Sequence, residues 1–135
     1  MNIEGECHCG EITFSAEVNP DQVIVCHCSD CQALSGSPYR TIIPALEGTF
    51  RIKSGNPTIY VKTAESGAQR EQAFCPKCGS PIYAAPAGEA ALQFVGIRVG
   101  SIKQKGQLTP NKQIWCRSAR DWVQDLSDVP KSETQ

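Results

Sequence analysis

The sequence predicts a mainly β protein with one short helix near the C-terminus. Several stretches alternate polar and apolar residues with a period of two, whereas a helical period is found only after residue 114. Cysteine pairs lie between these stretches and do not gather in a separate finger. We therefore expect small β-sheets whose core folds together with the cysteine clusters.

The predicted strands follow one another along the first hundred residues. The stretch EITFSAEV (11–18) has an apolar side chain at every second position, which is typical of a strand with one buried face. The stretch TFRIKSGNPTIYVKTA (49–64) indicates two strands joined by a turn at 55–57. A further strand is expected in ALQFVGIRVGSI (91–102).

A helical pattern begins at the end of the last cysteine-containing segment. Apolar residues spaced by four, three and four positions predict a short helix: Trp115, Ala119, Trp122 and Leu126. Ser118 is a suitable N-cap, with Asp121 in the acidic position of a capping box. We expect this helix to close the core with its two tryptophans.

Length and composition indicate one globular domain. The chain has 135 residues, of which 40% are apolar and 20% charged. The domain is expected to span 1–126, and the polar stretch 127–135, interrupted by Pro130, is expected to form a tail.

Charge and hydropathy argue against two classes of partner. The formal net charge is −1 and the basic residues are scattered, so the basic patch of a nucleic-acid-binding protein is missing. No stretch approaches the ~18 apolar residues of a membrane span, and the N-terminus lacks a signal-peptide pattern. We expect a cytoplasmic protein whose eight cysteines are reduced and available to metals. In a secreted chain the same even number would suggest a disulfide framework.

Two cysteine pairs have spacings that suit one metal ion. Cys7 and Cys9 form a C-x-C, and on an extended segment their sulfurs point to the same face. Cys75 and Cys78 form a C-x-x-C in a turn of the zinc-knuckle type. Together they supply the four thiolates of a closed structural zinc site. A redox role for the C-x-x-C would need a βαβ context, which the sequence does not show.

The remaining cluster has three cysteines, Cys26, Cys28 and Cys31, on what reads as one short loop. Three thiolates can fill three corners of a tetrahedron and leave the fourth to water or substrate, as in catalytic zinc sites. We therefore expect a second, open zinc site whose ion is more easily lost.

Spacing alone leaves other ligand sets open. Cys7 and Cys9 could join Cys28 and Cys31, and Cys116 could complete the triplet as a fourth ligand. For Cys116 we favour the role of a small buried hydrophobic residue. His8 and His27 each lie between cysteines, and we expect both rings to point away from the metal.

Some polar residues could bind a substrate. Arg40, Arg70 and Arg98 are candidates for contacts with substrate carboxylates, although solvated surface positions are the more common role of arginines. Backbone amides of the SGS stretch (35–37) could orient a substrate, and a tight turn explains that stretch equally well.

Several motifs in one order resemble the glutathione-dependent formaldehyde-activating enzyme family, whose wider membership includes centromere protein V. They are GECHCGEITF, VIVCHCSDCQALSGS, FCPKCGSPIY, FVGIRVGSI and PNKQIWCRSARDW, and together they cover about residues 3–122. The resemblance implies a zinc-stabilised β-tent of small twisted antiparallel sheets. It also implies that Cys7, Cys9, Cys75 and Cys78 bind the structural zinc and that Cys26, Cys28 and Cys31 bind the catalytic zinc.

The resemblance further implies a carbon–sulfur lyase that joins glutathione and formaldehyde into S-hydroxymethylglutathione. Many relatives have a basic residue after the third cysteine of the triplet, where this chain has Gln32, so a different thiol or aldehyde is one alternative. The other alternative is a non-catalytic binding module in which both zinc ions are structural and the triplet has a fourth protein ligand.

Overall fold

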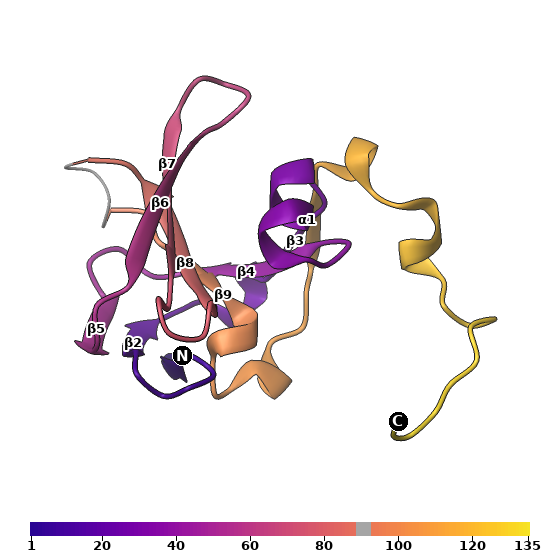
Figure 1. Cartoon of the computed structure of the whole chain (residues 1–135), viewed down its shortest axis with the longest axis horizontal. Helices are drawn as coiled ribbons and strands as arrows, with labels where there is room; N and C mark the ends of the chain where they lie inside the picture. The colour runs from indigo at the N-terminus through magenta and orange to yellow at the C-terminus, as the bar shows by residue number, and fades with distance from the viewer. Residues whose placement is uncertain (89–92) are drawn as a thin grey trace.

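The computed structural model describes residues 1–88 and 93–135, which form β-strands, one α-helix and short 3-10 helices (Figure 1). The strands are β1 (Asn2–Glu6), β2 (Thr13–Glu17), β3 (Ile24–Cys26), β4 (Arg40–Pro44), β5 (Arg51–Ser54), β6 (Thr58–Thr63), β7 (Gln69–Phe74), β8 (Pro81–Pro86), β9 (Gly96–Arg98) and β10 (Lys112–Ile114). The α-helix is α1 (Ser29–Ser35). The 3-10 helices are η1 (Pro20–Gln22), η2 (Val99–Ser101), η3 (Lys105–Gln107), η4 (Cys116–Ser118) and η5 (Asp121–Gln124).

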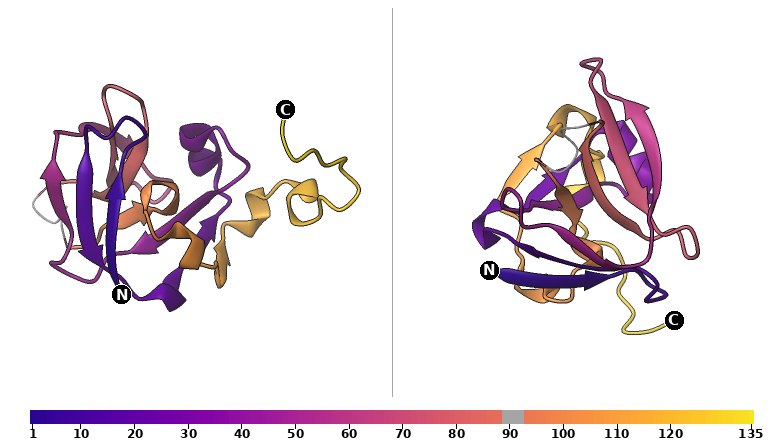
Figure 2. Two further views of the ribbon diagram at one scale, coloured as in Figure 1. Left: turned by 90° about the horizontal axis from the view of Figure 1, so that it is seen from below. Right: turned by 90° about the vertical axis from the view of Figure 1, so that its left-hand side faces the viewer.

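The strands form two sheets, which confirms the predicted mainly β class. The small sheet has the order β1-β2-β5, and the large sheet has the order β10-β3-β4-β9-β8-β7-β6. All pairs are antiparallel except β10 with β3, so the large sheet is mixed. In the right-hand view of Figure 2, β1 and β2, drawn in indigo, lie along the lower side of the molecule, below the large sheet.

The core lies between the two sheets. On the large sheet, Ile43 pairs with Ile97, Ile97 with Tyr83, and Tyr83 with Ala73, so one row of buried side chains crosses four strands. Ile3 and Phe14 of the small sheet belong to the same buried cluster. Because side chains alternate along a strand, the residues between these core positions point to the opposite face.

That opposite face of the large sheet is polar at its centre. Cys26 pairs with Arg40 between β3 and β4, and Arg98 of β9 pairs with Ile42 of β4. Two strands further along, Gln72 of β7 is in register with Ala84 of β8. The small side chains at Ala84 and Gly96 leave room for the long arginines beside them.

The two strands predicted in 49–64 are confirmed as β5 and β6, but they belong to different sheets. The corner between them is Gly55, whose φ is +74°. A Cβ there would lie 2.5 Å from the carbonyl oxygen of Glu11, so the turn requires glycine for both conformation and space.

The strand predicted over 91–102 is shorter than expected. Residues 91–92 lie outside the described residues, and the described part contains the three-residue β9 followed directly by η2. Arg98 is therefore the last residue of β9, where it pairs with Ile42 of β4, and its side chain reaches Gln72 of β7.

The predicted C-terminal α-helix is wrong. Residues 115–126 form two 3-10 turns, η4 and η5, and Ser118 is the last residue of η4 instead of an N-cap. Trp115 and Trp122 are 42% and 55% exposed, so neither closes the core. A helix this short is unstable without an apolar surface to pack on, and the core is already covered by the two sheets. The segment runs outward, in yellow in Figure 1.

No helix within residues 1–88 and 93–135 is long and apolar enough to cross a membrane.

Candidate metal centres

The first centre joins two turns far apart in the sequence. Cys7 and Cys9 follow β1, and Cys75 and Cys78 follow β7. Their four sulfurs lie within 4.8 Å of one another. The Sγ atoms of Cys7 and Cys9 are 3.6 Å apart, and those of Cys9 and Cys75 are 3.8 Å apart. A tetrahedron with zinc–sulfur bonds of about 2.3 Å has edges of about 3.8 Å, so the group fits a zinc ion.

Two thiols of this centre, those of Cys7 and Cys78, accept hydrogen bonds from the surrounding chain. The Ile12 amide N–H donates to Cys7 Sγ at 3.2 Å, and the Gly79 amide closes the turn on the Cys75 carbonyl at 2.8 Å. Hydrogen bonds from the side chain and backbone of Ser80 lower the pKa of Cys78 to about 5. A thiol that ionises below neutral pH is ready to bind a cation, because metals bind the thiolate form.

The second centre is the triplet, and it does not lie on a loop as the sequence suggested. Cys26 ends β3, Cys28 is the N-cap of α1, and Cys31 is in its first turn. Cys28 Sγ accepts a hydrogen bond from the Cys31 amide at 3.3 Å. The three sulfurs lie within 4.8 Å of one another, and the described residues contribute no fourth Cys, His, Asp or Glu to this group.

The thiols of the triplet differ in acidity. The interaction between Cys31 and Cys26 lowers the pKa of Cys26 and raises the pKa of Cys31, to which burial also contributes. A metal ion at this point would bind the sulfurs in their ionised form.

The other candidate ligands lie elsewhere. Cys116 is exposed and outside both groups, so the prediction of a buried residue is wrong for it. His27 is buried with its Nε2 at 2.8 Å from the Gln113 side-chain oxygen, and His8 is exposed. Neither ring is in a cysteine group. Cys7 and Cys9 lie in one group with Cys75 and Cys78 and not with the triplet.

A cavity of about 600 Å³ opens onto the triplet. Its walls come from α1, from the loop of the β6–β7 hairpin and from Trp115, Arg117 and Ser118. Asp30 of α1 forms an ion pair with Lys62 of β6, and Arg117 contacts Glu65 of the hairpin loop at 3.0 Å. The triplet therefore faces an open cavity large enough for a small-molecule substrate.

Two arginines at this centre are buried, against the expectation of solvated positions. Arg40 and Arg98 are 6% and 7% exposed. The side-chain oxygen of Gln72 accepts from Arg40 Nη1 at 3.3 Å and from Arg98 Nη2 at 2.7 Å. Burial, with a contribution from Arg40, lowers the pKa of Arg98 to about 9, and burial also lowers the pKa of Arg40. Guanidinium groups in proteins stay charged at neutral pH. Arg70 is half-buried and lies over the Phe94 ring at 5.8 Å.

Two further residues at the site could not be recognised as functional from the sequence. Gln72 is recognisable only once the register of β7 is known, because its position on the polar face depends on the pairing with β8. Trp115 lines the triplet cavity in a left-handed conformation with φ of 57°, the only positive φ among described residues other than glycine. Strained residues of this kind are concentrated at functional sites.

Gln32 lies in α1, directly after the third cysteine of the triplet. Its side-chain amide donates to the His27 carbonyl at 2.7 Å and to the Ser118 carbonyl at 2.9 Å. Arg120 Nε donates to its side-chain oxygen at 3.1 Å. Gln32 thus connects α1 to the C-terminal segment and places a cation from that segment beside the helix.

Comparison with known proteins identifies the family. The sequence model of the glutathione-dependent formaldehyde-activating enzyme matches residues 2–118, which is most of the chain. The chain belongs to the glutathione-dependent formaldehyde-activating enzyme family. The match contains all seven cysteines of the two centres. A search of curated proteins found no match.

A solved structure shares the fold of this formaldehyde-activating enzyme family member. It is the crystal structure of a Rhodobacter sphaeroides protein, a structural-genomics target, with 20% sequence identity and a TM-score of 0.62. The superposition covers 82% of this chain and 98% of that chain. At this identity the likeness supports the architecture of the two sheets.

Proposed function

We propose that this chain is a zinc-dependent carbon–sulfur lyase acting on a thiol–aldehyde adduct, with glutathione and formaldehyde as its substrates and S-hydroxymethylglutathione as the product. One observation carries the proposal. The triplet has three thiols and no fourth ligand among the described residues, and it opens onto a cavity of about 600 Å³. Membership of the glutathione-dependent formaldehyde-activating family supports the choice of substrates.

In this proposal Cys26, Cys28 and Cys31 hold the catalytic zinc and are not modified. Bound zinc supplies a cation that lowers the pKa of an incoming thiol toward neutrality. The thiol loses its proton to solvent, and its sulfur attacks the carbonyl carbon of formaldehyde. A carbon–sulfur bond forms, the carbonyl π electrons move to oxygen, and the oxygen takes a proton. The reverse sequence breaks the same bond.

The four-cysteine centre has a structural role in the same proposal. Cys7, Cys9, Cys75 and Cys78 fill all corners of a tetrahedron, so substrate has no position to occupy there. All eight cysteines have free thiols, which suits a reducing compartment, and we place the reaction in the cytoplasm.

Zinc content tests the difference between the two centres. Native mass spectrometry of the reduced chain is expected to give two zinc ions, and Cys28→Ser is expected to give one. Cys116→Ala is the matched control, because Cys116 lies outside both groups, and it should keep both ions. Loss of one zinc in Cys116→Ala would instead favour the binding module with a closed second site.

Activity is tested by the exchange of ¹³C-formaldehyde with S-hydroxymethylglutathione, followed by NMR in the presence of glutathione. The wild-type chain and Cys116→Ala are expected to accelerate the exchange, and Cys28→Ser is not. If the chain with two zinc ions gives only the uncatalysed rate with glutathione, the assignment to these substrates is wrong. The same assay with other thiols and aldehydes would then test the related chemistry.

A further inference from the structure

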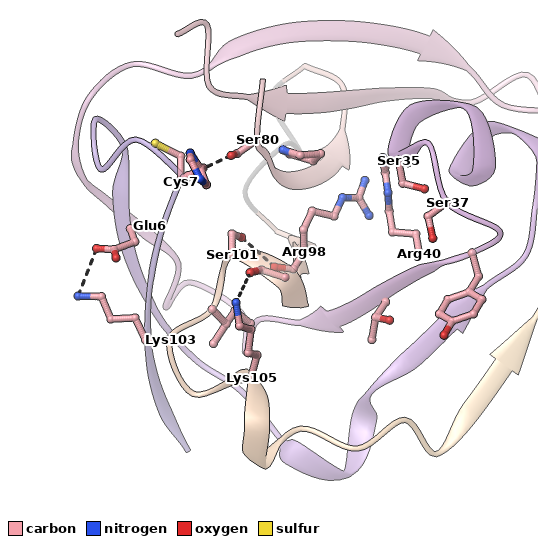
Figure 3. Close-up of a pocket in the computed structure, with 16 residues that line it drawn as sticks. Glu6, Cys7, Ser35, Ser37, Arg40, Ser80, Arg98, Ser101, Lys103 and Lys105 are labelled. Atoms are coloured by element: carbon pink, nitrogen blue, oxygen red, sulfur yellow. Dashed lines mark hydrogen bonds and ion pairs between the residues drawn. The ribbon is translucent and has the colours of Figure 1, made fainter. Parts of the chain in front are cut away.

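A second cavity, of about 670 Å³, lies beside the buried arginines (Figure 3). We call it the arginine pocket and define it by Arg40, Arg98, Ser35, Ser37, Tyr39 and Lys105. Figure 3 shows the side chains of Arg40 and Arg98 reaching into the same region, with Ser35 and Ser37 next to Arg40. Arg98 also lines the cavity of the triplet, so the two spaces adjoin at one guanidinium group.

The two guanidinium groups have no carboxylate partner within the described part of the chain. Their shared acceptor is the neutral amide oxygen of Gln72, and Arg98 Nε is buried without any hydrogen-bond partner. Glu6 is the one acidic residue that lines the pocket, and it pairs with Lys103 at 3.5 Å. Buried charges are normally paired, because an isolated charge is costly to remove from water.

The neighbouring metal centre does not balance this charge. Three thiolates and one Zn²⁺ carry a single net negative charge, whereas two guanidinium groups carry two positive charges. One positive charge therefore remains in a buried region, and Lys105 adds another at the pocket wall. An anion with oxygen acceptors would match a guanidinium fork and balance this charge.

We propose that the arginine pocket binds a carboxylate group through Arg98 and Arg40. The carboxylate belongs either to the thiol substrate, whose sulfur lies at the triplet, or to a separate small acid. In the first case Arg98 positions the substrate, since the same side chain borders both cavities. The inference deepens the proposed function, and it rests on that function only for the choice of thiol.

Calorimetric titration of the zinc-loaded full chain separates the two sources. Glutathione is expected to bind at least about tenfold more tightly than its diethyl ester, which keeps the thiol but has no free carboxylate. S-methylglutathione has both carboxylates and no free thiol, so its binding tests the pocket without the proposed chemistry. If glutathione and its diester bind equally and succinate still binds, the carboxylate comes from a separate acid.

Arg98→Gln tests the residue itself. The preference for glutathione over its diester, or the affinity for succinate, is expected to fall about tenfold. Arg51→Gln is the matched control, since Arg51 is exposed in β5 and lines neither cavity. The proposal is overturned if no carboxylate binds in a way that depends on Arg98. An equal loss of affinity for glutathione and 2-mercaptoethanol would also overturn it, because the arginines would then serve the thiolates alone.

A second variant covers the case in which Arg98→Gln does not fold. Gln72→Glu has nearly the same shape and places a carboxylate between the two guanidinium groups, so it should compete with the ligand and weaken carboxylate binding about tenfold. In the wild-type chain, the Arg98 Nε–H resonance should shift on addition of S-methylglutathione or succinate, because this group has no other partner. An unshifted resonance together with unchanged affinity in Gln72→Glu would contradict the proposal. Absence of formaldehyde chemistry in any of these samples would contradict the proposed function and leave carboxylate binding as measured.

Discussion

The side chain of Gln72 holds two cations with one neutral oxygen atom, at 2.7 Å from Arg98 and 3.3 Å from Arg40. This arrangement is poor for stability, since neither guanidinium is neutralised by it. A glutamine is suitable if the charge must remain available to a ligand. A glutamate at the same point would neutralise the arginines permanently. Gln72 therefore costs stability and keeps both guanidinium groups available to a ligand.

Gln72→Glu is accordingly expected to stabilise the chain while it weakens carboxylate binding. Two ion-paired hydrogen bonds replace two bonds to a neutral oxygen, and we expect a gain of about 1–2 kcal/mol in the free energy of unfolding. Chemical denaturation of zinc-loaded protein measures it. Gln69→Glu, at the start of the same strand and exposed, should leave stability nearly unchanged. A less stable Gln72→Glu would show that the guanidinium groups are already neutralised.

Gly5 is a second position at which adding a side chain would affect the stability of the fold. A Cβ at this residue would lie 2.0 Å from Cζ of the Phe14 ring, which covers the glycine from the neighbouring strand. Gly5→Ala must displace a core aromatic ring, so we expect a loss of roughly 2 kcal/mol or more by thermal or chemical denaturation. Gly106→Ala is the control, because nothing lies within 4 Å of its Cβ position. Equal stability of the two variants would refute the packing argument.

At the residue scale, the chelating pairs and the triplet could be predicted from spacing, but which pairs lie together and the environment of the arginines could not. Chelating spacings such as C-x-C are local properties, so they are visible in the sequence. The burial of Arg98 depends on strands β4, β8 and β7 meeting around it, and these lie up to 58 positions away in the chain, from Arg40 to Arg98. A single arginine in the sequence carries no sign of such neighbours.

At the scale of elements, the two cysteine centres differ in how much chain they connect. The four-cysteine centre joins the end of β1 to the end of β7, and its second pair lies 66 residues after the first, from Cys9 to Cys75. The triplet lies within β3 and the first turn of α1. Closing a long loop constrains the unfolded chain, whereas closing a six-residue segment does so very little.

Loss of the two metals should therefore have different effects on folding. Cys75→Ser is expected to lower the melting temperature strongly, because zinc at such sites contributes on the order of 10 kcal/mol. Cys28→Ser should lose zinc and keep most of its stability, since serine is itself a good N-cap for α1. Melting curves by circular dichroism measure both. Similar melting temperatures for the two variants would contradict the assignment of the first centre as structural.

The error in the C-terminal segment is also an error at the scale of elements. The spacing of Trp115, Trp122 and Leu126 has the period of a helix, but period alone does not provide a surface for the helix to cover. Conversely, α1 was not predicted, since its seven residues are few and polar and its N-cap is a cysteine. Its position depends on the metal ligands and on the C-terminal segment held by Gln32.

For the whole molecule, the two sheets and the core between them account for stability, and the last residues do not. Leu126 and Val129 are half exposed, and residues 127–135 are exposed throughout. A chain that ends at Leu126 is expected to keep two zinc ions and a melting temperature within about 2 °C of the full chain. A chain that ends at Asn111 loses β10, the parallel partner of β3, and should melt much earlier. A large drop in melting temperature for the chain that ends at Leu126 would show that the tail packs on the domain.

The alternation along the large sheet has a consequence for how this protein can evolve. On β4, the side chain of Ile43 points into the core, whereas those of Arg40 and Ile42 point to the polar face of the large sheet. Side chains of β9 and β7 alternate between the same two faces. Substitutions at every second position can therefore alter ligand preference while the buried core keeps its composition. An insertion or deletion of one residue in β4 would exchange the two faces and damage both properties together. We expect that diversification of this scaffold proceeds by point substitution within the strands, with changes of length confined to the connections between them.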